Sequence, residues 1–168
     1  MDVQHGYYIE DLQPGLQAVF SKTVTEADIV NFAGVTGDFN PLHVNKEFAA
    51  ATRFGARVAH GVMGAGMLSA VMGTRLPGPG AVYLSQHLQF LAPIYIGDTV
   101  TARVIVKELQ MERRRVVLTT QCLVRDHLVL DGEATLLVDS HYHEPALIEA
   151  AALPTVLKQF WEDGPEDT

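Results

Sequence analysis

The chain has 168 residues, of which 48% are hydrophobic and 19% charged, and its formal net charge is −8 at pH 7. This length suffices for one domain with its own hydrophobic core. The acidic balance argues against nucleic acid as a partner, because phosphate binding needs clustered cations, and no apolar run approaches the roughly 18 residues of a membrane span.

The start of the chain is polar and acidic, without the basic and apolar segments of a secretory signal. Cys122 is the single cysteine and has no partner for an internal disulfide, which agrees with a reducing compartment. We therefore expect a cytoplasmic protein with no membrane association.

The first predicted elements are a strand and two helices. Residues 16–25 alternate enough to form a strand. Thr25 can cap a helix, with Asp28 as its box-like partner three residues on, and this helix should end by Gly37. Residues 45–51 predict a second, short helix.

The most unusual stretch is residues 60–73, which is apolar on nearly every side. It is too short to span a membrane, so it predicts a helix buried at the centre of the domain. Its glycines cost roughly 1 kcal/mol each in helix propensity. They are tolerable if another element packs very close to the helix backbone.

The remainder of the core has β character, and we expect four long strands in a meander: residues 82–91, 99–111, 115–125 and 128–138. Hairpin turns should fall at Arg113–Arg114 and Asp126–His127, while Asp131–Gly132 is interpreted as a bulge within the last strand. Together these elements predict an α+β domain, residues 1–143, in which an antiparallel sheet wraps around the central helix. Residues 144–168 should add a helical extension and an acidic tail.

Candidate chemistry lies between the first two helices, where Asp38 and His43 are five residues apart around the turn Asn40–Pro41. Pro41 keeps Asn40 out of the helical region, so the turn can bring the carboxylate and the imidazole to one side. Such a pair can deprotonate a shared water and return the proton elsewhere, while the Asn40 amide can hold both groups. The alternative is purely structural: turn hydrogen bonds from Asp38 and Asn40, and helix capping by His43.

A second feature follows seventeen residues later, where His60–Gly61 opens the apolar helix. Backbone N–H groups at a helix N-terminus lack partners and lie at the positive end of the helix dipole. The Gly61 N–H can therefore polarise a carbonyl and stabilise an enolate, and glycine lets a substrate approach the backbone. The alternative is a simple helix start with close packing.

These residues resemble a known family. Residues 32–43, with Asp38, Asn40, Pro41 and His43, are similar to the signature of MaoC-like, R-specific enoyl-CoA hydratases. The similarity continues through residues 54–61 and, more weakly, residues 90–99. The resemblance implies the hot-dog fold.

The resemblance also implies residue roles. Asp38 and His43 would activate the water, Asn40 would orient them, and the Gly61 amide would bind the thioester oxygen. His60 and Ser69, on the central helix, would contact the substrate in supporting roles. No metal or redox cofactor is implied, since coenzyme A is part of the substrate.

We therefore predict addition of water to trans-2-enoyl-CoA, giving a (3R)-hydroxyacyl-CoA, by a homodimer or higher oligomer. Two alternatives stay open: a hot-dog acyl-CoA thioesterase, and a non-catalytic partner subunit of a hydratase or dehydratase complex. The phosphates of coenzyme A need surface cations, which the sequence does not rank: Arg53, Arg57, Arg103, Lys107 and Arg113–Arg115.

Overall fold

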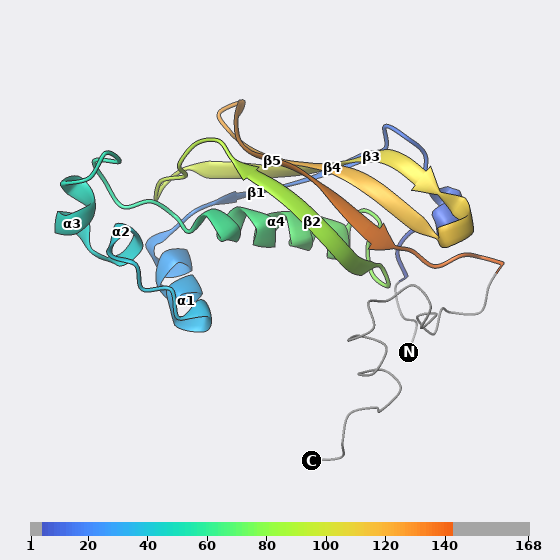
Figure 1. Ribbon diagram of the computed structural model, residues 1–168, viewed down its shortest axis with the longest axis horizontal. Helices are drawn as coiled ribbons and strands as arrows, with labels where there is room; N and C mark the ends of the chain where they lie inside the picture. Colours follow the sequence, from blue (N-terminus) through green and yellow to red (C-terminus); the bar gives the residue numbers. More distant parts are fainter. Residues whose placement is uncertain (1–4, 143–168) are drawn as a thin grey trace, which may run out of the picture.

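The computed structural model describes residues 5–142 and shows an antiparallel sheet curving over one long helix (Figure 1). The sheet has five strands in the order β1-β3-β4-β5-β2. Their bounds are close to those predicted: β1 Gln17–Thr23, β2 Val82–Phe90, β3 Thr99–Gln110, β4 Arg115–Val124 and β5 His127–Leu137. The α+β architecture with a sheet around a central helix is thus confirmed.

The predicted meander holds only for β3, β4 and β5, which pair in sequence order. Strand β2 instead pairs with β5 and forms the far edge of the sheet, opposite β1. The connection from β2 to β3, residues 91–98, can span about 26 Å at 3.3 Å per residue. Three inter-strand spacings amount to only about 14 Å, so strands adjacent in sequence were not forced to pair.

Both predicted hairpin turns are present, but the predicted bulge at Asp131–Gly132 is wrong. Gly132 pairs regularly with Leu88 on one side and Thr120 on the other. The β4–β5 register shifts instead between Cys122 and Leu123. A Cβ at Gly132 would lie 2.0 Å from the carbonyl oxygen of His87, so this glycine is explained by the close approach of β2.

Within residues 5–142, four α-helices lie between β1 and β2 in the chain: α1 Glu26–Thr36, α2 Pro41–Val44, α3 Lys46–Ala50 and α4 Gly61–Thr74. Short 3₁₀ turns lie at Ile9–Asp11 and Met111–Arg113. The capping box of α1 is present, with Asp28 N–H donating to Thr25 and the Asp28 carboxylate accepting from the Thr25 N–H. An ion pair of 2.8 Å with Lys22 and these hydrogen bonds lower the pKa of Asp28 to about 2.

Helix α4 lies on the concave face of the sheet, and its packed side carries Met63, Leu68 and Val71 into the core. Gly64 allows close contact there, because a Cβ would lie 3.1 Å from Leu130 and 3.6 Å from Cys122. The prediction of burial on all sides is wrong for the opposite side, where Val62 is 55% exposed. Uniform apolarity gave no sign that the sheet covers only one side of the helix.

No helix within residues 5–142 is long and apolar enough to cross a membrane. The predicted C-terminal extension, residues 144–168, lies outside the described residues, so the expected domain boundary after residue 143 stays a prediction.

Candidate active site

His43 is carried by the four-residue helix α2, whose start is organised by Asn40. The Asn40 side-chain oxygen accepts the Leu42 N–H at 3.1 Å, and the Asn40 carbonyl accepts the His43 N–H at 2.8 Å. Pro41 at the first helical position suits this cap, because its missing N–H would have no partner there. Asn40 therefore fixes the helix that presents His43, which is more specific than the general orienting role predicted.

Asp38 follows the left-handed residue Gly37, with φ +75°, at the end of α1. Its carboxylate accepts the backbone N–H of Asn40 at 3.2 Å, and its own N–H donates to Thr36 at 3.3 Å. The structural alternative considered for Asp38 and Asn40 is therefore partly realised, since both make turn hydrogen bonds. These bonds leave acceptor capacity on the Asp38 carboxylate.

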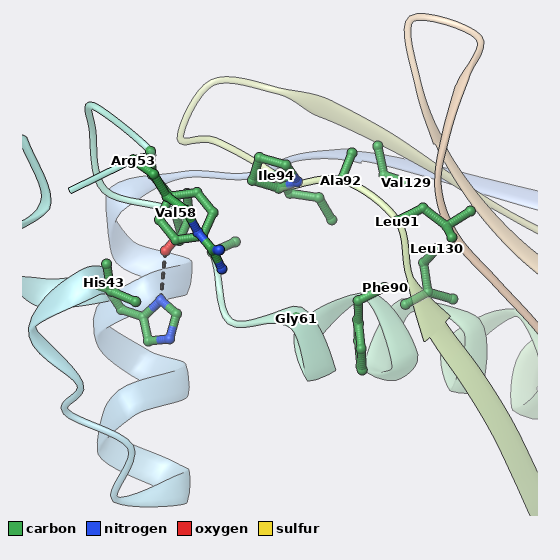
Figure 2. A pocket seen from close by; sticks show the side chains of 14 residues that line it. His43, Arg53, Val58, Gly61, Phe90, Leu91, Ala92, Ile94, Val129 and Leu130 are labelled. Atoms are coloured by element: carbon green, nitrogen blue, oxygen red, sulfur yellow. Dashed lines mark hydrogen bonds between the residues drawn. The ribbon is translucent and has the colours of Figure 1, made fainter.

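The hydrogen bond of His43 decides which of its nitrogens can act as a base. Nδ1 lies 2.8 Å from the carbonyl oxygen of Val58 (Figure 2). A carbonyl oxygen can only accept, so Nδ1 carries the hydrogen, and Nε2 of the neutral ring has a free lone pair. The geometry thus gives His43 a defined tautomer with its basic nitrogen available.

Asp38, His43 and His60 converge. Each offers a nitrogen or carboxylate oxygen, and these three atoms lie within 4.8 Å of one another. This is the one such group of potential metal ligands found in residues 5–142. Two ligand atoms that each lie about 2.0–2.2 Å from one zinc ion are at most about 4.4 Å apart, which is less than the 4.8 Å limit found here. A water molecule with hydrogen bonds of about 2.8 Å can bridge atoms at such a spacing.

A cavity of about 390 Å³ opens beside His43. One wall comes from the segment between α2 and α4 and includes His43, Arg53 and Gly61. The other wall is apolar and comes from the end of β2, the following loop and β5: Phe90, Leu91, Ala92, Pro93, Ile94, Val129 and Leu130 (Figure 2). An apolar cavity with a few polar groups on one side is the usual form of a small-molecule site.

Gly61 is the first residue of α4, so its N–H has no acceptor within the helix. It lines the cavity together with His43, and the helix dipole adds positive potential at this end. A Cβ at Gly61 would lie 3.0 Å from the ring of Phe90, which shows how closely the cavity wall approaches. The base and a potential oxyanion donor therefore face one space.

Comparison with known proteins gives the family of this site. The family model described as MaoC like domain matches residues 12–126. The chain belongs to the MaoC-like family. It is 55% identical to a 3-hydroxybutyryl-CoA dehydratase of Methylorubrum extorquens over 131 residues, covering 78% of this chain and 83% of that protein. It is 51% identical to an (R)-specific enoyl-CoA hydratase of Rhodospirillum rubrum over 132 residues, covering 79% and 92%.

Solved structures of this family share the fold. The unliganded R-hydratase PhaJ1 from Pseudomonas aeruginosa matches with a TM-score of 0.77 and 34% identity, over 81% of this chain and 88% of that one. The (R)-hydratase of Aeromonas caviae involved in PHA biosynthesis matches with a TM-score of 0.75 and 38% identity, over 77% and 98%. The hot-dog fold predicted from the sequence is confirmed.

Of the six predicted site residues, only His43 and Gly61 line the cavity of this MaoC-like domain, whereas Asp38, Asn40, His60 and Ser69 do not. His60 is only 1% exposed and donates from Nε2 to the backbone carbonyl of Asp38 at 2.9 Å. Ser69 is exposed on α4, eight residues beyond Gly61 and hence about 12 Å along the helix. Neither residue lines the cavity as it stands in one chain.

The sequence did not single out Val58, whose carbonyl fixes the tautomer of His43. A backbone acceptor has no residue signature, so no pattern could have revealed it. Arg53 was one of several unranked cations, yet it lines the cavity and lies 5.1 Å from the ring centroid of its neighbour Phe54. Cys122 is buried in the core, where desolvation raises its pKa to about 12, which fits the interpretation that it is not a nucleophile.

Proposed function

We propose that this MaoC-like domain hydrates the double bond of a trans-2-enoyl thioester to give the (3R)-hydroxyacyl thioester, and catalyses the reverse dehydration. The observation that carries the proposal is the free Nε2 lone pair that the Val58 hydrogen bond leaves on His43, a ring that has a nitrogen within 4.8 Å of an Asp38 carboxylate oxygen. The names of the relatives from Methylorubrum extorquens and Rhodospirillum rubrum support the substrate class and the R product.

In the proposed mechanism, Asp38 and His43 hold one water. His43 Nε2 takes a proton from it as the oxygen attacks C3, and the electrons of the C2–C3 double bond move toward the thioester carbonyl. The resulting enolate oxygen accepts the Gly61 N–H. The protonated pair then returns a proton to C2, so the elements of one water molecule are added and no redox change occurs. We accordingly propose that the reaction needs no metal or redox cofactor.

Crotonyl-CoA tests this function against thioester hydrolysis, because a thioesterase would direct the water to the carbonyl carbon. Hydration removes the enoyl absorbance while the free thiol stays constant, whereas hydrolysis releases coenzyme A thiol. An R-specific and an S-specific 3-hydroxyacyl-CoA dehydrogenase, added separately, report the stereochemistry. Release of thiol in step with substrate loss, or product oxidised by the S-specific enzyme alone, would refute the proposal. No turnover at any chain length would favour the non-catalytic subunit instead.

We also propose that the protein acts as a homodimer joined through β2. This strand is hydrogen-bonded on one side only, to β5, and its ends expose Tyr83 and Phe90. An unpaired strand edge with apolar side chains is a surface that proteins normally cover. The exposed side of α4, which carries Val62, would be covered in the same assembly.

The dimer would also account for Ser69. Because this serine lies about 12 Å along α4 from Gly61, it is too far away to contact a thioester group bound at Gly61 of its own chain. We propose that it contributes to the site of a second protomer.

For the carrier, we propose that Arg53 binds a phosphate of coenzyme A. The other candidates are occupied or remote: Arg57 pairs with Glu26, Lys107 pairs with Glu133, and Arg103 bonds to Gln121. Residues 113–115 lie at the β3–β4 turn, at the opposite end of the sheet from the start of α4 (Figure 1). Arg53 is exposed, lines the cavity, and has no ion pair with any residue that the structure describes.

A further inference from the structure

His60 is a buried histidine in which only one of the two ring nitrogens makes a hydrogen bond. Its Nε2 lies 2.9 Å from the carbonyl oxygen of Asp38. Because a carbonyl can only accept, Nε2 carries the hydrogen and Nδ1 carries the lone pair. Within residues 5–142, Nδ1 has no hydrogen-bond partner although it is buried. The ring therefore gives one directed bond and leaves one polar atom unsatisfied.

The bond of His60 is one half of a reciprocal pair. His60, at the start of α4, donates to the backbone of Asp38 in the catalytic loop. His43, in the helix that ends this loop, donates to the backbone of Val58, two residues before His60. The two rings stack with centroids 3.9 Å apart, and the Val58 N–H also donates to the Leu42 carbonyl at 3.2 Å. The catalytic loop is thus joined to the start of α4 at Asp38 and to the preceding segment at Val58.

Stability alone does not explain a histidine at this position. A buried polar atom without a partner costs about 1–3 kcal/mol, and His60 stacks against Phe32 and His43 as an apolar side chain could also pack. What an apolar residue cannot supply is the hydrogen bond to Asp38. That bond acts at a sensitive place, because Asp38 is exposed and follows the left-handed Gly37. Its hydrogen bonds to Thr36 and Asn40 stay within the same loop, whereas the bond from His60 ties this loop to α4.

We propose that His60 is a positioning residue that holds the backbone of Asp38 at the distance from His43 at which both side chains share one water. The inference rests on the proposed hydration and replaces the expected substrate contact of His60. A displacement of about 1 Å in a catalytic group can reduce the rate about 100-fold. Loss of the His60 bond therefore lowers kcat and leaves substrate binding largely unchanged.

Two substitutions separate this role from packing. His60→Leu removes the donor and also the unsatisfied Nδ1, so we expect kcat for crotonyl-CoA to fall about 30- to 100-fold, KM to change less than twofold, and Tm to stay near or above that of the wild type. His60→Gln places an amide N–H near the former Nε2 and restores kcat to within about fivefold. Phe32→Leu is the matched control, since Phe32 contacts the same ring without bonding the loop, and its kcat should stay within about threefold.

A second readout does not depend on turnover. In ¹⁵N-labelled protein, the amide resonances of Asp38 and Phe39 should shift and broaden in His60→Leu and recover in His60→Gln. Unchanged resonances in His60→Leu, or full activity of this variant, would overturn the positioning role. A rise in KM at constant kcat would instead indicate that His60 contacts the substrate. If kcat and Tm fell as much in His60→Gln as in His60→Leu, His60 would serve packing alone. Wild-type protein that hydrates no enoyl thioester would refute the proposed function, while the resonances would still decide the positioning.

Discussion

Arg53→Ala should weaken the use of coenzyme A thioesters without affecting the chemical step. The guanidinium lines the cavity that holds His43 and Gly61, and the reacting atoms are served by other groups. Two unit charges about 4 Å apart interact by about 1 kcal/mol in water and about 4 kcal/mol at an effective dielectric constant of about 20. Arg53 is exposed, so the lower part of this range applies, and about 1–1.4 kcal/mol corresponds to a five- to tenfold rise in KM.

The assay compares three crotonyl thioesters that differ only in the carrier: coenzyme A, 3′-dephospho-coenzyme A and pantetheine. For Arg53→Ala we expect a five- to tenfold higher KM with coenzyme A, unchanged kcat, and no change with pantetheine, which has no phosphate. If 3′-dephospho-coenzyme A already behaves like pantetheine, the 3′-phosphate is the group bound. If it behaves like coenzyme A, Arg53 binds the phosphates nearer the pantetheine, a group that acyl carrier protein also presents.

Salt and a second variant complete the test. The Debye length falls from about 30 Å at 0.01 M to about 3 Å at 1 M ionic strength, so KM of the wild type should rise with salt more steeply than that of Arg53→Ala. Arg113→Ala is the matched control, because Arg113 lies in the turn at the far end of the sheet. An equal rise in KM for pantetheine and coenzyme A thioesters would refute phosphate binding and assign Arg53 to the shape of the cavity.

Three further outcomes are expected. Asp38→Asn and His43→Ala should each lower kcat about 10³-fold or more with modest changes in KM, and the double variant should lose little more, since the two act on one water; near-normal turnover of Asp38→Asn would contradict the shared-water mechanism. Val82→Lys, at the free edge of β2, should convert a dimer to monomers in sedimentation velocity, and a wild type that is an active monomer would exclude the dimer. Asp28→Asn should lower the free energy of unfolding by about 1–2 kcal/mol at pH 7. This figure follows from the lowering of the Asp28 pKa from 3.8 to about 2, reduced because the ion pair with Lys22 is partly exposed. Because the folded pKa is the lower one, this difference should shrink as the pH falls from about 4 toward 2, which denaturant titrations at several pH values can measure.

The strands were predictable because one face of each is buried and the period of two survives in the sequence. Strand β3 is the clearest case, with Val100, Ala102, Val104 and Val106 buried in alternation. The position of β2 was not predictable in this way, since its residues alternate equally well beside β3 or beside β5. The same limit applies to Gly132, whose cause is the backbone of His87 on another strand rather than a local bulge.

The catalytic pair was predictable because Asp38 and His43 belong to one continuous loop. Their supports were not, since Val58 and Asp38 contribute backbone oxygens that any residue would supply. His60 illustrates the difference. Its identity suggested a polar group that meets the substrate, whereas its burial and its bond direct it to the loop. Sequence patterns therefore identified the reacting groups and missed what holds them.

The position of the site at the start of α4 follows from the packing of the helix as a whole. Gly64 lets α4 settle within contact distance of Leu130 and Cys122, which sets the depth of the helix against β4 and β5. The same β5 residue, Leu130, lines the cavity together with Gly61. This one contact between helix and sheet consequently fixes the positions of the Gly61 N–H, the apolar wall and the histidine bonds to the loop. A catalytic loop attached there gains a fixed oxyanion donor, while one attached at the exposed side of α4 would have neither a wall nor a fixed distance to the base.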